Sequence, residues 1–352
     1  MAKPDPKPAR TLKMVFKDRD AFVNVDDPIH KDLSTAARHG DALFVTCDET
    51  AGIDRITEID GGHFGDHVHF DIGEIFDLPA GPDGEMDIEG IAVDGDWMWV
   101  MGSHSLTRGK PKPDAARTDA LDAMGRIWRA PNRAFIGRFP VVQDNGGPRI
   151  VRKDGDRRAA SIRLHRKRSV LKRWLTGDTH IGPFLDIPSK ENGLDLEGIA
   201  AKGMRIWLGL RGPVLREHAV ILELEMKITK RGRLKARKLA NGRRYRKHLV
   251  NTNGMGLRDL RFDGDDLLLL TGTVMAGDGP SEILRWRNAS AVTTDGIEEV
   301  EHVIDLPYRG ARDHPEGLCD WGDGEWLVVY DSPAEGRLGE KPASVTADIW
   351  RF

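Results

Sequence analysis

The sequence predicts an all-β protein, a β-propeller of four-stranded blades with five visible repeats, and it leaves five or six blades open. The phrase DIEGIAVDGDWMWVMG at 87–102 returns as DLEGIAAKGMRIWLGL at 195–210. Three weaker relatives begin at Asp32, Gly256 and His314. In all five copies a glycine-containing turn separates two short apolar segments, and the two chain ends carry strand-like segments that could complete one blade together.

The first two strands of each blade are predicted from the hairpin turns. These turns fall at 39–40, 94–95, 202–203, 263–264 and 323–324. Asp-Gly between apolar segments is typical of a tight hairpin, in which both turn residues adopt positive φ.

The third and fourth strands follow from the apolar segments between the hairpins. We expect third strands at 52–59, 125–130, 220–226, 282–287 and 347–352, and fourth strands at 69–79, 182–188, 245–250 and 299–307. The last repeat stops at its third strand, so we expect residues 12–16 to supply its fourth strand and close the ring. Residues 1–11 are expected to be a disordered polar tail, and residues 12–352 one domain.

The second repeat is about twice as long as the others. We interpret residues 131–181 as an insertion, because helix-like spacing of apolar residues near 155–180 predicts a helix there. A degenerate sixth blade in the same stretch is the alternative.

Polar residues are predicted to converge at one end of the central channel. Alignment on the turns makes Ser34, Glu89, Glu197, Arg258 and Glu316 equivalent, at the start of the channel-lining strands. The second strands run back antiparallel and return to the same face. Other residues expected at this mouth are Asp48, His104, Lys190, Asn192, Arg211, His314 and Asp331.

Several carboxylates in one ring repel each other unless a cation compensates them. Arg258 is one such cation, and a bound Ca²⁺ or Mg²⁺ is another, with Glu89, Glu197 and Glu316 as its ligands. The structural alternative is that each glutamate accepts backbone N–H groups while the following glycine permits close packing at the axis.

Composition excludes several classes of protein. A net charge of −3 argues against a general nucleic-acid-binding protein, although 149–173 and 227–247 are basic and could bind phosphates; a solvated surface is the alternative. The apolar runs are too short to span a membrane, no signal peptide is recognised, and two cysteines make no disulfide framework, so we expect a cytoplasmic protein. No nucleotide-binding motif appears, and we expect no nucleotide or organic cofactor.

The motifs PSKENGLDLEGIA (188–200), LRGPVL (210–215), GLRDL (256–260) and HPEGL (314–318) resemble a bacterial β-propeller family catalogued as domain of unknown function 3616. The repeated D-x-E-G is similar to esterase-like phytase domains and, more loosely, to gluconolactonase-type propellers. The latter resemblance implies a metal at the axis, held partly by a glutamate before a channel strand. Glu89, Glu197 and Glu316 match that pattern, whereas Ser34 and Arg258 depart from it.

Two functions are consistent with these features. The first is a metal-assisted hydrolase of a small ester, lactone or phosphoester, in which Arg211 and Arg258 hold an anionic ligand and His104 or His314 moves protons, with Asp48, Lys190, Asn192 and Asp331 as further ligand-binding residues. The second is a non-catalytic binding or scaffold propeller that uses the same face for a protein or a small ligand. We expect a small anionic ligand and no membrane or nucleic-acid partner, and we leave a protein partner open.

Overall fold

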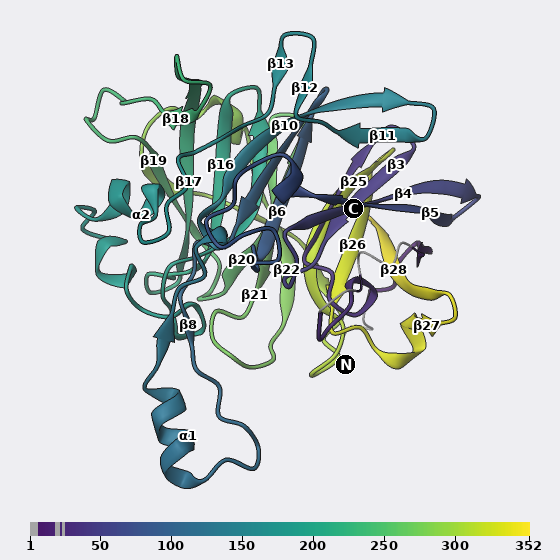
Figure 1. Cartoon of the computed structure of the whole chain (residues 1–352), viewed down its shortest axis with the longest axis horizontal. Helices are drawn as coiled ribbons and strands as arrows, with labels where there is room; N and C mark the ends of the chain where they lie inside the picture. Colours follow the sequence, from purple (N-terminus) through teal and green to yellow (C-terminus); the bar gives the residue numbers. More distant parts are fainter. Residues whose placement is uncertain (1–5, 18–21, 23–24) are drawn as a thin grey trace.

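The computed structural model describes residues 6–17, 22 and 25–352. The strands pair into five four-stranded antiparallel units, which confirms the predicted propeller of four-stranded blades (Figure 1). The units are β2 (Thr35–His39), β3 (Ala42–Thr46), β4 (Gly52–Asp60) and β5 (His63–Asp71); β6 (Ile88–Asp94), β7 (Trp97–Gly102), β10 (Ile136–Asp144) and β11 (Gly147–Ile150); β15 (Asp195–Lys202), β16 (Arg205–Gly212), β17 (His218–Ile228) and β19 (Arg246–Asn251); β20 (Gly256–Asp263), β21 (Asp266–Gly272), β22 (Ser281–Trp286) and β24 (Glu301–Leu306); and β25 (His314–Gly322), β26 (Glu325–Asp331), β28 (Ala343–Arg351) and β1 (Arg10–Phe16).

The five units close into a ring around their first strands. These strands contact one another in the order β2, β6, β15, β20, β25 and back to β2. Five clusters of buried apolar side chains lie between consecutive units, so each sheet is covered on both faces by its neighbours. Burial between sheets therefore stabilises the ring, and no single unit has a core of its own.

The predicted closure of the last unit by the N-terminal segment is confirmed. β1 pairs antiparallel with β28 from Arg10 opposite Ile349 to Phe16 opposite Ala343. Leu12, Met14 and Phe16 are buried against β28 and the first unit. The strand begins two residues earlier than expected, so Arg10 and Thr11 are ordered in the sheet; residues 1–5 of the predicted tail lie outside the described residues.

The predicted boundaries within the second unit were wrong. Residues 127–128 form only β9 (Ile127–Trp128), a short ribbon with β8 (Thr107–Arg108), and the true third and fourth strands are β10 and β11. The predicted insertion at 131–181 therefore contains two strands of the unit. Pro140 weakens the strand signal of β10, but it sits where pairing with β7 ends and pairing with β11 begins, a position that tolerates a missing N–H.

The additional segments of the second unit lie on either side of these strands. An extension with β8, α1 (Arg117–Met124) and β9 precedes β10 and projects away from the ring (Figure 1). After β11 come the ribbon β12 (Lys153–Asp154) and β13 (Arg157–Arg158), then β14 (Ala160–Ser161) and α2 (Val170–Leu175). A helix near 155–180 is thus confirmed, with the Ser169 side chain accepting a hydrogen bond from the Lys172 N–H as its N-cap.

Most other predicted strands overlap observed ones. The remaining strands are β18 (Leu234–Ala236), β23 (Gly296–Glu298) and β27 (Leu338–Glu340), each at the outer part of a unit. Two predicted fourth strands were wrong. The strand predicted at 69–79 is β5, which spans His63–Asp71 and so ends soon after the predicted start. The segment 182–188 contains the 3₁₀ turn Gly182–Phe184 and no strand. Pro183 and Pro188 cannot donate to a strand ladder, which explains the second error.

The inner hairpin turns differ from the predicted form at four of five positions. In those four turns the residue before the glycine ends the strand, and only the glycine has a positive φ, between 55° and 62°. The turn at Asp323 (φ 52°) and Gly324 (φ 73°) has positive φ at both residues, as expected for Asp-Gly. Within the described residues, no helix combines the length and the apolar character needed to cross a lipid bilayer.

Candidate functional site

A register irregularity occurs at the same position in four of the five units. The strand pairing shifts between Ile88 and Gly90, between Leu196 and Ile199, between Leu257 and Asp259, and between Pro315 and Gly317. The residues inside these shifts include Glu89, Glu197, Arg258 and Glu316, which the sequence had aligned. A β-bulge changes the direction of the side chain that it carries, so the repeated phrase encodes four re-aimed charged residues.

The glycine of the motif has a separate, steric role. A Cβ on Gly198, which has φ of 90°, would lie 2.6 Å from the Cα of Asp259 in the next inner strand. A Cβ on Gly317 would lie 2.8 Å from the Cα of Thr35. The glycine therefore permits neighbouring inner strands to approach closely, as the structural alternative predicted.

Arginines neutralise one half of the mouth. Arg258 Nη1 lies 3.0 Å from Glu197 Oε2 and 2.7 Å from Glu316 Oε1. Arg211 Nη1 lies 2.9 Å from Glu197 Oε1, and the same guanidinium pairs with Asp195. All five side chains are largely buried, so the third, fourth and fifth units are joined by an ion-pair network in which both arginines share Glu197.

The other half of the mouth is an acidic cluster of Asp48, Asp87 and Glu89. One carboxylate oxygen from each residue lies within 4.8 Å of the others. Arg133 Nη1 lies 3.2 Å from Asp87 Oδ2, but within the part of the chain that the structure describes neither Asp48 nor Glu89 forms an ion pair. Ser34 Oγ donates a 2.6 Å hydrogen bond to Asp48 Oδ1. Three carboxylates thus converge from two units, and among the described residues one arginine, Arg133, forms an ion pair with them.

Burial and mutual repulsion raise the pKa values of two of these carboxyl groups. Burial, and then the Asp87 carboxylate, raise the pKa of Asp48 to about 7. Burial and the neighbouring Asp48, Glu197 and Asp87 raise the pKa of Glu89 well above its usual range. An extra positive charge at this position would relieve both effects.

Further carboxylates, Asp32 and Asp331, extend the acidic cluster toward the fifth unit. Burial, followed by Asp48 and Asp331, raises the pKa of Asp32 to about 9. Burial opposes ionisation of Asp331 as well, but the nearby His314 imidazole and a hydrogen bond from Ser332 outweigh it and lower the pKa of Asp331. In return, the Asp331 carboxylate, with Oδ2 3.7 Å from His314 Nδ1, raises the pKa of His314.

His314 lines a small pocket beside the arginine network. Its Nε2 lies 3.2 Å from Asp278 Oδ1, and about a third of its side chain is exposed. The pocket, about 50 Å³ in volume, is also lined by Arg258, Thr273 and Glu316. An imidazole with a raised pKa at this position is suited to donating a proton.

His104, predicted as a proton-transfer residue, lies in a different environment from His314. It is buried with φ of 57°, its Nε2–H donates to the Phe135 carbonyl at 3.3 Å, and Ser169 Oγ lies 3.1 Å from its Nδ1. Burial, followed by the Lys172 charge, lowers its pKa to about 3. The neutral imidazole contacts a partner through each nitrogen and thereby links the end of β7 to Ser169, the N-cap of α2.

The two remaining predicted ligand residues lie on one loop. Asn192, with φ of 65°, accepts a hydrogen bond from the Val214 N–H at 2.8 Å and donates to the Val214 carbonyl at 3.2 Å. Its amide therefore holds the loop after β16. Lys190 is exposed in the 3₁₀ turn Ser189–Glu191.

Sequence reasoning missed four members of the mouth: Asp32, Asp87, Arg133 and Asp195. Two of them carried a signal, because Asp87 and Asp195 are the first residue of D-x-E-G in both strong copies. Arg133 carried none, because it arrives from the loop before β10, which the wrong strand assignment had placed in an insertion.

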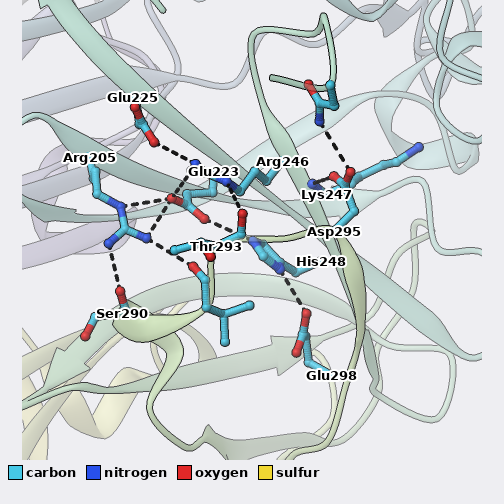
Figure 2. Close-up of polar contacts among 12 residues, drawn as sticks. Arg205, Glu223, Glu225, Arg246, Lys247, His248, Ser290, Thr293, Asp295 and Glu298 are labelled. Carbon is cyan, nitrogen blue, oxygen red and sulfur yellow. Dashed lines mark hydrogen bonds and ion pairs between the residues drawn. The ribbon is translucent and has the colours of Figure 1, made fainter. Parts of the chain in front are cut away.

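A second polar cluster lies away from the mouth, between the third and fourth units (Figure 2). Glu223 is fully buried and accepts hydrogen bonds from Arg205 at 2.7 Å and Arg246 at 2.7 Å, and His248 Nε2 lies 3.2 Å from its other oxygen. His248 Nδ1 in turn lies 3.0 Å from Glu298. Because each of these charged side chains has a partner, we interpret the cluster as a structural contact that holds β17, β19 and the segment that carries β23 together.

The two basic stretches of the sequence lie side by side. Arg163, Arg168 and Arg173 from the first stretch and Arg233 from the second all contribute, after burial, to lowering the pKa of His165. The Arg244 guanidinium lies 6.0 Å from the centre of the Trp174 ring. The basic residues thus gather over α2 and β18.

Comparison with curated proteins found no match. Among solved structures, the chain is similar to a GH43 glycoside hydrolase described as having endo-xylanase and exo-arabinofuranosidase activity (13% identity, TM-score 0.41, 91% of this chain and 49% of that one). It is also similar to the glutaminyl cyclase of Myxococcus xanthus (9% identity, TM-score 0.43, 98% and 100%). A GH43 β-1,3-galactosidase solved with galactodeoxynojirimycin gives 9% identity, a TM-score of 0.42 and coverage of 99% and 100%. The chain spans about half the length of the first of these proteins.

A family model described as a protein of unknown function, DUF3616, matches residues 32–348. This range includes all four bulged positions of the mouth and the first strand of every unit. The chain therefore belongs to the DUF3616 family, as the resemblance of its motifs implied.

Proposed function

We propose that the channel mouth binds a divalent cation, Ca²⁺ or Mg²⁺, through Asp48, Asp87 and Glu89, and that the protein is a metal-assisted hydrolase of a small anionic ester, lactone or phosphoester. The observation that carries the proposal is the convergence of three carboxylates within 4.8 Å, with a single ion pair, Arg133 to Asp87, among the described residues. All three donors are hard oxygens, which suit Ca²⁺ and Mg²⁺. When bound, such an ion polarises a carbonyl or phosphoryl oxygen.

The predicted set of ion ligands changes in this proposal. Glu89 remains a ligand, but Glu197 and Glu316 share Arg258, which already supplies positive charge to them. Asp48, predicted as a ligand-binding residue, and Asp87 take their places. The crowding that raises the pKa of Asp48 and Glu89 supports this choice.

The chain's own groups have defined roles in the proposed reaction. Arg258 and Arg211 offset the carboxylate charges on their side of the mouth, so an anionic substrate meets less repulsion there. His314, whose pKa the Asp331 carboxylate raises, donates a proton to the leaving group from the wall of the small pocket. Asp331 Oδ2 lies 3.7 Å from His314 Nδ1, so its charge favours the protonated imidazole.

The second candidate is a binding propeller without catalytic activity. Two observations favour it: the pocket beside His314 has a volume of only about 50 Å³, and both Arg211 and Arg258 are already paired with carboxylates. In this case the ion would fix the mouth for a ligand or a protein partner.

Calorimetric titration of chelator-treated protein with CaCl₂ and MgCl₂ tests the site. We expect one ion to bind, and Asp48→Asn or Glu89→Gln to weaken binding at least tenfold. Glu316→Gln is the matched control, because Glu316 is paired with Arg258. The affinity of this variant for the ion should stay near that of the wild type. Absence of binding, or equal loss in all three variants, would contradict the ion site.

Activity separates the two candidates. The ion-loaded protein is assayed with chromogenic esters, phosphoesters and lactones, and His314→Gln should lower kcat while leaving ion affinity unchanged. Ion binding without turnover of any of these substrates would favour the binding propeller.

A further inference from the structure

A second group of metal-ligating side chains lies on the outer strands of the fourth unit. It consists of Glu282 on β22 with His302 and Asp305 on β24, and one ligand atom from each residue lies within 4.8 Å of the others. Neither proposed function uses these residues.

Backbone geometry creates this group. Glu282 is directly opposite Asp305, and the pairing then shifts: Ile283 is opposite Ile304, but Leu284 is opposite His302. Val303 is therefore the extra residue of a bulge. In a regular strand, residues three apart point to opposite faces. The bulge places His302 on the face of Asp305, with His302 Nε2 at 2.9 Å from Asp305 Oδ1.

The group combines two like charges with an incompletely satisfied carboxylate. Glu and Asp directly opposite each other across strands destabilise a sheet. Burial raises the pKa of Glu282, and so does the Asp305 carboxylate, although the nearby His302 acts against them. Glu282 Oε1 is buried and has no hydrogen-bond partner among the described residues, and the residue is only 9% exposed.

The distances suit a single ion. His302 Nε2 lies 3.7 Å from Glu282 Oε2 and 2.9 Å from Asp305 Oδ1. With bonds of about 2.0–2.2 Å, two ligands of one zinc ion are at most ~4 Å apart. One imidazole nitrogen and two carboxylates form a donor set for a borderline ion, whereas the all-oxygen mouth suits a hard one.

We propose that Glu282, His302 and Asp305 form a binding site for a divalent transition-metal ion, with Zn²⁺ as the best-suited ion. Asp305 is 78% exposed at its side chain and His302 is 48% exposed, so the ion enters from solvent and keeps water in its open coordination position. Glu282 anchors it from the buried side.

Titration of chelator-treated full-length protein with ZnSO₄, in competition with a chromogenic chelator, tests the site. We expect one Zn²⁺ to bind, and His302→Gln and Glu282→Gln each to weaken it at least tenfold. His63→Gln is the matched control: His63 Nδ1 lies 2.5 Å from Asp60 Oδ1, also three residues away, but the described residues supply no third ligand there. Its Zn²⁺ affinity should stay at the wild-type value.

Two further readouts decide the outcome. Asp48→Asn at the mouth should leave Zn²⁺ affinity unchanged, which makes this result independent of the proposed function. Circular dichroism checks that each variant is folded. Absence of Zn²⁺ binding, wild-type affinity in both His302→Gln and Glu282→Gln, or an equal loss in His63→Gln, which would indicate adventitious surface binding, would overturn the proposal.

Discussion

At the scale of single residues, the mouth is governed by an imbalance of charge. Its carboxylates outnumber the arginines beside them, and the pKa values of Asp48, Glu89, Asp195 and Glu316 are raised, with burial as the largest cause. When the pKa of a carboxyl group is higher in the folded state than in the unfolded state, the free energy of unfolding falls as the pH rises above the pKa of the unfolded chain. Positive charge near these groups therefore contributes most at high pH.

Arg258 provides a test of this charge balance. Arg258→Met leaves Glu197 and Glu316 buried without that partner, and removal of one member of a buried pair typically costs about 3–5 kcal/mol. We expect a loss of about 3 kcal/mol in the free energy of unfolding at pH 8. At pH 5 the loss should be smaller, because burial raises the pKa of Glu316 and the lower pH favours its uncharged form, which needs the arginine less.

Urea denaturation at the two pH values measures this difference. Arg258→Lys, which keeps the charge, is the control and should lose less stability at pH 8. An equal loss in Arg258→Met at pH 5 and pH 8 would show that packing, and not charge, is what the arginine contributes.

At the scale of elements, the last unit depends on both chain ends. β1 buries Leu12, Met14 and Phe16, and burial of each such side chain is worth about 1.5–3 kcal/mol. Deletion of residues 1–18 should therefore cost on the order of 6 kcal/mol, a large share of the stability of a typical domain. We expect a much lower melting temperature or an unfolded protein.

Deletion of residues 1–8 is the matched control, because it keeps all of β1 and should leave the melting temperature close to that of the full chain. Thermal unfolding followed by circular dichroism compares the two. If the longer deletion melted with the full chain, β1 would not be required for closure of the ring.

How far the elements could be predicted depended on their local signals. Glycine turns and alternating apolar residues located every inner hairpin. Signals failed where local chemistry conflicts with the pairing: Pro140 lies inside β10, and Gly65 and Asp66 lie inside β5. Those residues have low strand propensity, and tertiary pairing overrides it. The bulges could not be predicted, because register is a property of two strands and not of one.

At the scale of the whole molecule, the ring brings together residues that are far apart in sequence. The repeated motif was enough to predict that Glu89, Glu197, Arg258 and Glu316 share one end of the channel. It was not enough to predict which carboxylates are paired, because Arg211 returns on a second strand and Arg133 comes from an extension. The division into a neutralised half and an acidic half appears only when all five units are in place.

Thermal unfolding of the wild type and of Asp48→Asn at pH 5 and pH 8, in chelator or with Ca²⁺ or Mg²⁺, tests whether a divalent cation binds in the acidic half of the mouth. In chelator, the wild type should lose stability between pH 5 and pH 8, because ionisation of Asp48, with a pKa of about 7, is unfavourable in the folded state. The ion should restore the melting temperature at pH 8 and have little effect at pH 5, and both effects should be reduced in Asp48→Asn. A wild-type melting temperature that neither ion changes at pH 8 would contradict a divalent-cation site in the acidic half of the mouth.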